Sequence, residues 1–334
     1  MALGFTTTRN ERRLDRKLAS ILAGTYTADD FIIADAKDAD MAFGVQAPGV
    51  VPGDPGQFKT RSAYLDDMRA LVQQGELDIL LTSASNGERL SGDGSLDDSI
   101  TLAVRGNDTT DIWFPRGARY AQSASRPFRT ANLSAVRNFC DLVLYSVTFV
   151  NDLERDLETL EAYANFRRQA VESGIRHFLE VFNPNIDSGL EGAELGAFVN
   201  DSIIRSLAGV TAVERPIFLK MGYNGREAIA ELAGHDPSLV VGILGGAAGT
   251  TRDTFELLHR AEGAGARVAL FGRKIQRAES QLDLVGLMRP VIRGEISPAD
   301  AVRAYHDALG RAGLASVRSL DADLQITDPV LLAE

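Results

Sequence analysis

The amino-acid sequence predicts an α/β fold, a (β/α)8 (TIM) barrel. Eight short apolar runs recur along the chain, mostly continuous rather than alternating, which is typical of parallel strands buried on both faces. Amphipathic helical patterns separate most of these runs, as right-handed βα units require. The length of 334 residues is ordinary for such a barrel. The runs span residues 31–36, 77–82, 100–104, 141–147, 176–181, 216–221, 239–244 and 267–271.

Helical patterns are clearest in the second half of the chain. Residues 151–173 carry leucines at close to helical spacing, and residues 297–309 behave alike. Ser297 followed by Pro298 offers an N-cap and a proline at the first helical position. These signals predict helices that follow the fourth and eighth runs.

Three segments lie outside the simple βα repeat. Residues 11–22 predict an extra helix before the first strand. Residues 46–60 and 105–129 form long loops after the first and third strands, on the face where barrels build active sites. Since no linker-like segment interrupts the pattern, we expect residues 1–334 to form one barrel domain, with 1–28 as an N-terminal helical extension.

Composition excludes several classes of protein. The formal net charge of -11 and the pI near 5.0 argue against a nucleic-acid partner, because phosphate backbones need a basic face. The single cysteine, Cys140, cannot form an internal disulfide and indicates a reducing compartment. No apolar run approaches the ~20 residues needed to span a bilayer. We therefore expect no membrane contact and a cytoplasmic location.

Lys220 ends the sixth apolar run, at the mouth of the predicted barrel. Low dielectric disfavours a charged ammonium group, so a buried amine can become a nucleophile near neutral pH. The natural reaction of that amine is Schiff-base formation with a carbonyl substrate. The alternative is a surface lysine at a strand end, the commoner situation for lysine.

Glu180 ends the fifth run, on the strand next to that of Lys220. A carboxylate at this depth is costly unless it is paired or functional. Beside an imine-forming lysine, Glu180 would supply the acid–base catalysis that carbinolamine dehydration needs. The alternative is a structural ion pair that only positions the lysine. Tyr145, on the fourth run, is a further candidate for proton transfer in the pocket.

The end of the first run carries several charged residues. We expect one aspartate, Asp38 first and Asp35 second, to bind substrate hydroxyls or to keep Lys220 correctly protonated. Lys37, and Arg105 after the third run, are expected to contact substrate.

A metal site is the competing interpretation of these carboxylates. The four histidines form no His-x-His pair and fall at a strand start or in helical or loop segments, which disfavours zinc. We therefore expect no metal and no cofactor. Spacing alone leaves open an Mg²⁺ site built from Asp35, Asp38, Asp40 and Glu180.

Glycine-rich turns follow the last two runs. Gly245 and Gly246 follow the seventh run, and Gly272 and Arg273 follow the eighth. Barrels often build phosphate sites from these two loops, and a guanidinium suits phosphate. Paired glycines also occur simply because tight turns need them. Nearby hydroxyl donors are those of Thr250 and Thr251.

With these residues in view, the sequence resembles the class I (Schiff-base) aldolases. It is similar to bacterial and archaeal fructose-bisphosphate aldolases and to tagatose-1,6-bisphosphate aldolase, most clearly over about residues 175–280. The carrying segments are residues 217–223, 242–246 and 265–273.

The resemblance implies roles for individual residues. Lys220 would form the Schiff base, and Glu180 would transfer protons as in the tagatose-type enzymes. A first-strand aspartate, Asp38 or Asp35, would assist. The two glycine turns, with Gly245, Gly246, Gly272 and Arg273, would bind substrate phosphate.

The chain departs from the family pattern in two places. Leu144 stands where the tagatose-type enzymes carry a strand-four lysine, and the first strand lacks the usual Asp-His-Gly or Asp-Gln-Arg-Gly sequence. The Schiff-base core is retained while substrate recognition differs.

The sequence thus predicts a metal-independent class I aldolase, an aldehyde-lyase of carbohydrate metabolism acting on a keto-sugar or keto-sugar phosphate. We expect a homo-oligomer, as related barrels usually are. Two alternatives stay open: transaldolase or acyl-transfer chemistry on the same lysine, and a non-catalytic barrel that binds a sugar phosphate.

Overall fold

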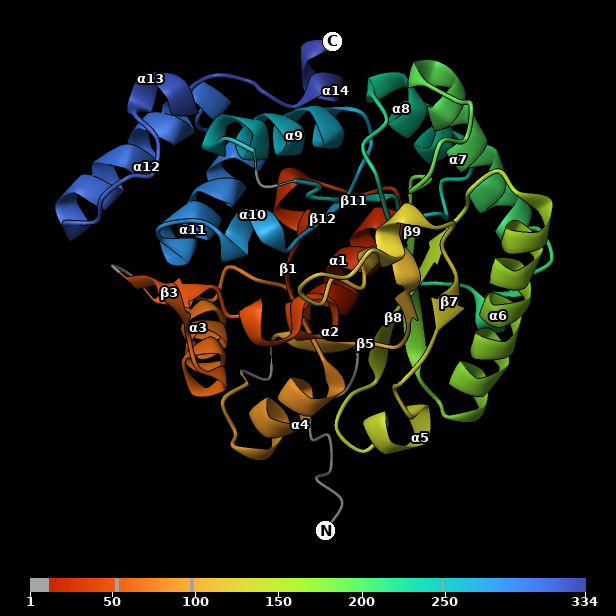
Figure 1. Ribbon diagram of the computed structural model, residues 1–334. Coiled ribbons are helices and arrows are strands. Elements are labelled where there is room, and N and C mark those ends of the chain that lie inside the picture. Colours follow the sequence, from red (N-terminus) through yellow and green to blue (C-terminus); the bar gives the residue numbers. More distant parts are fainter. Residues whose placement is uncertain (1–11, 52–53, 97–98, 248) are drawn as a thin grey trace.

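Eight parallel strands close into a barrel in the computed structural model, which describes residues 12–51, 54–96, 99–247 and 249–334 (Figure 1). Each strand overlaps one of the eight predicted runs, so the predicted (β/α)8 barrel is confirmed. In order around the barrel the strands are β1 (Ile32–Lys37), β4 (Ile79–Thr82), β5 (Thr101–Arg105), β8 (Leu142–Thr148), β9 (Arg176–Phe182), β10 (Leu219–Met221), β11 (Gly242–Leu244) and β12 (Val268–Phe271).

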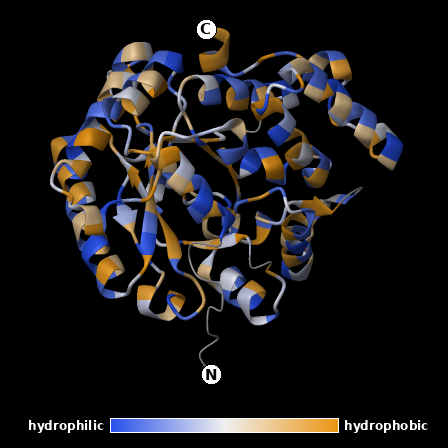
Figure 2. Cartoon of the chain, turned by 180° about the vertical axis from the view of Figure 1, so that it is seen from behind, coloured by the Kyte–Doolittle hydropathy of each residue, from blue (hydrophilic) through white to orange (hydrophobic). Residues whose placement is uncertain are grey.

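Helices surround the strands as an outer ring (Figure 1). Hydrophobic and hydrophilic residues alternate along them in Figure 2, as expected of helices that bury one face. The predicted helix over 151–173 is α6, and Ser297 accepts a hydrogen bond from the Asp300 backbone at the start of α12. The larger helices are α3 (Arg61–Gln74), α4 (Ala84–Gly92), α6 (Leu153–Glu172), α7 (Gly192–Leu207), α8 (Arg226–His235), α9 (Thr251–Gly263), α11 (Gln281–Ile292) and α12 (Pro298–Ala312).

Alternation along the strands divides their side chains between two hydrophobic clusters. One cluster joins the strands to the surrounding helices. The other fills the barrel interior with every second residue of the strands, as period-two geometry requires. Residues two positions apart on a strand therefore face the same side, and one of the two alternating sets faces the inside of the barrel. The interior residues include Ala34, Ala36, Ala103, Leu142, Leu144, Phe178, Phe218, Val268 and Leu270.

Helix α1 (Arg13–Leu22) closes the amino-terminal end of the barrel and matches the extra helix predicted there, whose first residue lies outside the described residues. Leu14 and Leu18 pack into the interior cluster. On its polar side, Lys17 donates to Asp78 at 2.9 Å and to the Phe31 carbonyl at 2.8 Å. Burial lowers the pKa of Lys17 to about 8, although Asp78 opposes that effect.

The two long loops predicted after the first and third strands are present, and both contain structure. The first holds an antiparallel hairpin of β2 (Val50–Val51) and β3 (Asp54–Phe58). The loop begins earlier than the predicted residue 46, directly after β1, and its first part is α2 (Ala39–Phe43). The second holds β6 (Asp108–Thr109) paired with β7 (Pro127–Phe128), ahead of α5 (Leu133–Val136).

The remaining short elements include α10 (Arg273–Gln276), α13 (Leu320–Asp323) and α14 (Pro329–Leu332). Within the described part of the chain, no helix is long and apolar enough to cross a bilayer.

The ion pair beneath the barrel gives a stability prediction. Asp78 is fully buried, and its carboxylate also accepts from the Ile33 backbone at 2.8 Å. Asp78→Ala leaves the Lys17 ammonium buried without its partner, so the free energy of unfolding should fall by about 3 kcal/mol. Chemical denaturation measures the loss. Asp66→Ala, which removes an exposed carboxylate paired with Arg69, should change stability far less. Equal losses in the two variants would contradict the assigned role of α1.

Candidate active site

Five polar side chains near the carboxyl ends of the strands alternate in step with the interior residues, so they face the inside of the barrel. Asp38 follows Ala34 and Ala36, Arg105 follows Ala103, and Ser146 follows Leu142 and Leu144. Glu180 follows Phe178, and Lys220 follows Phe218. The register pairs Lys220 with Glu180 and Glu180 with Ser146, so these residues stand at one level on three neighbouring strands.

Glu180 is the centre of a hydrogen-bonded charge network. Lys220 Nζ forms an ion pair with its Oε1. Its Oε2 accepts from Ser146 Oγ at 2.6 Å and from Arg105 Nη2 at 3.2 Å. Lys220 is 5% exposed and Glu180 is 1% exposed, so the pair is almost dry. Three donors therefore fix the carboxylate against the amine.

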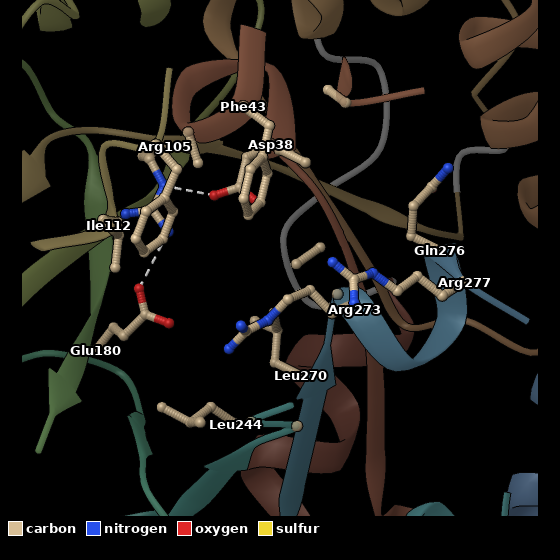
Figure 3. Close-up of a pocket in the computed structure, with 18 of the residues that line it drawn as sticks. Asp38, Phe43, Arg105, Ile112, Glu180, Leu244, Leu270, Arg273, Gln276 and Arg277 are labelled. Atoms are coloured by element: carbon tan, nitrogen blue, oxygen red, sulfur yellow. Dashed lines mark hydrogen bonds and ion pairs between the residues drawn. The ribbon is translucent and has the colours of Figure 1, made fainter. Parts of the chain in front are cut away.

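Arg105 links Glu180 to the second carboxylate of the site. Its Nε donates to Asp38 Oδ2, as Figure 3 shows. Its Nη1 donates to Ser146 Oγ at 2.9 Å. Burial by itself would raise the pKa of Asp38, but Arg105 and Lys220 outweigh that effect and lower it. Asp38 is thus held as a carboxylate beside the two cations.

Asp108 is a carboxylate of a different kind. It lies in β6, just beyond β5, and is buried at the edge of the same cavity. Burial raises its pKa to about 6, against the opposing effect of Arg105. Asp108 can therefore both accept and donate a proton near neutral pH.

The cavity above this network has a volume of about 290 Å³. Asp38, Arg105, Glu180 and Lys220 line its floor together with Gly245, Gly246, Gly272 and Arg273. In Figure 3, Arg273 extends toward the middle of the pocket, and Arg277 and Gln276 lie across from Arg105. Most of the predicted site residues therefore share one small cavity.

The two glycine turns also have packing reasons to be glycine. A Cβ at Gly245 would come within 3.0 Å of the Phe271 ring, and one at Gly272 would come within 3.2 Å of Ala36. Gly246 adopts a left-handed φ of 63°. These glycines therefore shape the pocket wall whether or not their amides bind a ligand.

Arg273 and Arg277 give the cavity a second cationic region. Within the described residues, neither guanidinium has a hydrogen-bond or ion-pair partner. Burial lowers the pKa of Arg273, and the neighbouring Arg277 lowers it further. Solvent nevertheless reaches both side chains through the cavity. Two guanidinium groups without counter-ions form a place for an anionic group of a ligand.

The expectation that Asp35 and Lys37 face the substrate is corrected by the structure. Both have the opposite parity to Asp38, so they point out of the barrel toward the helices and do not line the cavity. Lys37 Nζ lies 3.3 Å from Asp35 and donates to Gln276 at 2.7 Å. Lys37 therefore supports the pocket from behind by fixing Gln276, which lines it.

Tyr145 is also misplaced by the sequence prediction. It alternates with Leu144 and Ser146, and its ring packs outward against Tyr163 and Phe166 at centroid distances of 5.1 and 4.3 Å. Its side chain lines a separate cavity beside α6 and lies away from Lys220. Tyr145 is therefore not placed to exchange a proton with Lys220.

Thr250 and Thr251 bind the chain's own carboxyl-terminal segment. The Thr250 hydroxyl donates to the Gln325 carbonyl at 2.7 Å, and the Thr251 amide donates to Asp323 at 2.8 Å. Asp253 accepts from the Thr250 amide and from Thr327. The amino-terminal end of α9 is thus already neutralised by carboxylates, so the phosphate role expected of the two threonines is corrected.

Several residues of the cavity lay outside the sequence prediction. Arg277 lines it, as do the aromatic residues Phe43, Phe58 and Phe114 from the long loops. Arg277 lies four residues after Arg273, one helical turn away, and this spacing could have identified it. Nothing in the sequence places the aromatic residues, because their position depends on how two loops fold together.

The described residues contain no group of three or more His, Cys, Asp or Glu side chains arranged for a metal ion. Asp38 and Glu180 instead share the Arg105 guanidinium, which stands where a cation between them would have to lie. This geometry disfavours the Mg²⁺ alternative.

Asp108 gives a pH prediction with a defined sign. Its folded pKa of about 6 exceeds the ordinary carboxyl value of 3.8, so the folded state loses stability as pH rises from about 4 to about 6. Asp108→Asn removes this cost and should gain stability relative to wild type over that window, by about 3 kcal/mol. Denaturation from pH 4 to pH 8 measures the difference.

Asp253→Asn is the control of opposite sign. Hydrogen bonds from Thr327 and the Thr250 backbone outweigh burial and lower the pKa of Asp253. Its stabilising effect is therefore present above the ordinary carboxyl pKa and lost as pH falls. The difference between Asp108→Asn and wild type would contradict the assignment if it did not change with pH.

No protein-family model matches this chain, and no curated protein matches it in sequence. Solved structures do match its fold. A Schiff-base-forming fructose-1,6-bisphosphate aldolase aligns with a TM-score of 0.60 at 15% identity, covering 82% of this chain and 99% of its own. An archaeal fructose-1,6-bisphosphate aldolase with its catalytic lysine bound to a carbinolamine aligns at 0.59 and 15% identity, covering 83% and 100%.

The fructose-bisphosphate aldolase from Slackia heliotrinireducens DSM 20476 aligns with a TM-score of 0.60 at 15% identity, covering 95% of this chain and 96% of its own. At such low sequence identity, these matches establish only the fold. The chain therefore has the (β/α)8 barrel fold seen in Schiff-base-forming fructose-1,6-bisphosphate aldolases.

Proposed function

We propose that the protein is a class I aldolase, a carbon–carbon lyase that forms a Schiff base between Lys220 and a carbonyl substrate. The observation that carries the proposal is the contact of Lys220 Nζ with the buried carboxylate of Glu180, at the floor of a cavity in an aldolase-type barrel. A lysine so placed has a base within reach and little competing water.

The first half of the reaction joins substrate to enzyme. Glu180 accepts a proton from Nζ, and the neutral amine attacks the carbonyl carbon. A proton then passes from the attacking nitrogen to the carbonyl oxygen, which gives a neutral carbinolamine. Glu180 then returns its proton to the hydroxyl, water leaves, and a protonated imine forms. Ser146 and Arg105 hold Glu180 in position through both transfers.

The second half breaks the carbon–carbon bond. A carboxylate removes the proton of the substrate hydroxyl on the far carbon of the bond to be cleaved, the carbon β to the imine carbon. The bond's electron pair moves into the imine, an aldehyde leaves, and an enamine remains. Asp108 is suited to this step because its pKa lies near neutral pH. Protonation of the enamine carbon and hydrolysis by water regenerate Lys220.

The cationic region supports an anionic carbonyl substrate. Arg273 and Arg277 project into the cavity and provide the charge for a carboxylate or phosphate group (Figure 3). Keto-sugar phosphates are one class that meets this requirement, and the solved neighbours are named for such a substrate.

Reductive trapping tests the lysine directly. Incubation with an anionic keto compound and borohydride should add the mass of the reduced substrate, and peptide mapping should place that mass on Lys220. Lys220→Met should abolish trapping. Lys274 is the alternative lysine for trapping. Burial lowers its pKa to about 8, and its side chain lies against Gly245, which lines the cavity. Mass on Lys274, or none with any carbonyl donor, would contradict the proposal.

Glu180→Gln separates chemistry from folding. The amide keeps the shape of Glu180 but cannot carry the proton, so kcat should fall by about 10²- to 10⁴-fold. Steady-state kinetics and pre-steady-state trapping measure the effect. Glu256→Gln is the matched control, because Glu256 is also a buried carboxylate, bonded to Arg252 and Arg260 on α9 away from the cavity. A kcat unchanged in Glu180→Gln would remove the proton-transfer role.

A further inference from the structure

The cavity above Lys220 has two chemically different walls. One wall carries Arg273, Arg277 and Gln276. The other is formed by large apolar side chains, and Figure 3 shows two of them, Phe43 and Ile112, on the side of Asp38 and Arg105. We call the set of Phe43, Phe58, Ile112, Phe114 and Phe182 the apolar wall.

The two long loops build most of the apolar wall by folding against each other. Phe43 of α2 stacks on Phe114 with ring centroids 5.4 Å apart and an interplanar angle of 16°. The Phe114 amide donates to the Ala42 carbonyl at 2.8 Å. Arg116 lies over the Phe58 ring, 5.9 Å from its centroid. The wall is therefore a packed structure supported by contacts between the loops.

The members of the apolar wall keep part of their surface open. All five are only half-buried, although they lie deep among loop and strand residues, and each of them lines the cavity. Apolar surface that faces water in a concave site is unfavourable, and a ligand group that covers it is bound more tightly.

The polar groups of the same cavity are mainly charged, and its neutral hydrogen-bonding side chains are Gln46 and Gln276. Among the described residues that line it, none is Ser, Thr, Tyr or Asn. Asp38, which lines the cavity, already accepts from Arg105. A chain of sugar hydroxyls placed against the apolar wall would lose its water and gain few hydrogen bonds in return.

We propose that the substrate is an amphiphilic carbonyl compound, with an anionic group on Arg273 and Arg277 and an aliphatic or aromatic group against the apolar wall. Its carbonyl lies between the two walls, at Lys220. This rests on the proposed function for the step at Lys220. It narrows the class of anionic carbonyl substrates to anionic ketones with an apolar substituent, in place of keto-sugar phosphates. The anionic group is a carboxylate or a phosphate.

The test measures binding of three compounds that cannot form an imine, so that it is independent of lysine chemistry. Phenylbutanoate and phenylpropyl phosphate carry an apolar group, and glucitol phosphate carries hydroxyls instead. Isothermal titration calorimetry with the full-length protein should show that at least one apolar compound binds more tightly than glucitol phosphate, with a dissociation constant lower by about tenfold or more. Comparison of the two apolar compounds identifies the anionic group.

Two variants assign the binding to the two walls. Phe58→Ala should weaken the apolar compounds by about tenfold and leave glucitol phosphate within about twofold, and Phe58→Leu should restore the lost affinity. Arg277→Ala should weaken all three anions by about tenfold. Phe198→Ala and Arg205→Ala, at a half-buried phenylalanine and an exposed arginine of α7 outside the cavity, are the matched controls.

The proposal is overturned if glucitol phosphate binds as tightly as both apolar compounds, or if Phe58→Ala weakens all three alike. Failure of trapping at Lys220 with these preferences intact would instead overturn the aldolase function and leave the ligand class standing. Trapping at Lys220 without these preferences would do the reverse.

Discussion

The charge network around Glu180 is the constraint on which the site depends. Lys220 and Arg105 supply two positive charges, and Glu180 and Asp38 supply two negative ones, all nearly out of contact with water. Any one of these charges buried alone would cost several kcal/mol, so the four are stable only as a set. The same arrangement holds a carboxylate against an amine, which is what imine chemistry requires. Structure and chemistry thus rest on one group of contacts.

The rest of the barrel is organised to permit this network at one end only. Below it, mainly apolar residues, including Phe178 and Phe218, fill the interior layers, and Leu14 and Leu18 of α1 close the far end. Water therefore reaches the network mainly from the cavity above. The buried pair of Lys17 with Asp78 anchors the closing helix, so the dry floor of the pocket depends on contacts at the opposite end of the barrel.

Above the network the molecule departs from a generic phosphate-binding barrel. The amino-terminal end of α9 is occupied by Asp253 and Asp323 from the chain itself, and positive charge is supplied by Arg273 and Arg277 instead. The long loops add the apolar wall on the other side. The Lys220–Glu180 pair at the floor and the different groups at the mouth are consistent with the local sequence likeness around Lys220 and the departures in the first and fourth strands.

The sequence by itself determined the barrel, its eight strands, the closing helix and the positions of Lys220 and Glu180, because continuous apolar runs and helical periodicity are local properties. It also contained the alternation along each strand that puts Asp38 and Ser146 on one face and Asp35, Lys37 and Tyr145 on the other. Which of the two faces is the interior is certain only once one interior residue on each strand is known. Tertiary structure alone decided that Arg105 joins two carboxylates, that α9 is capped internally, and that phenylalanines from two loops meet. Those contacts join residues far apart in the chain, and no local pattern encodes them.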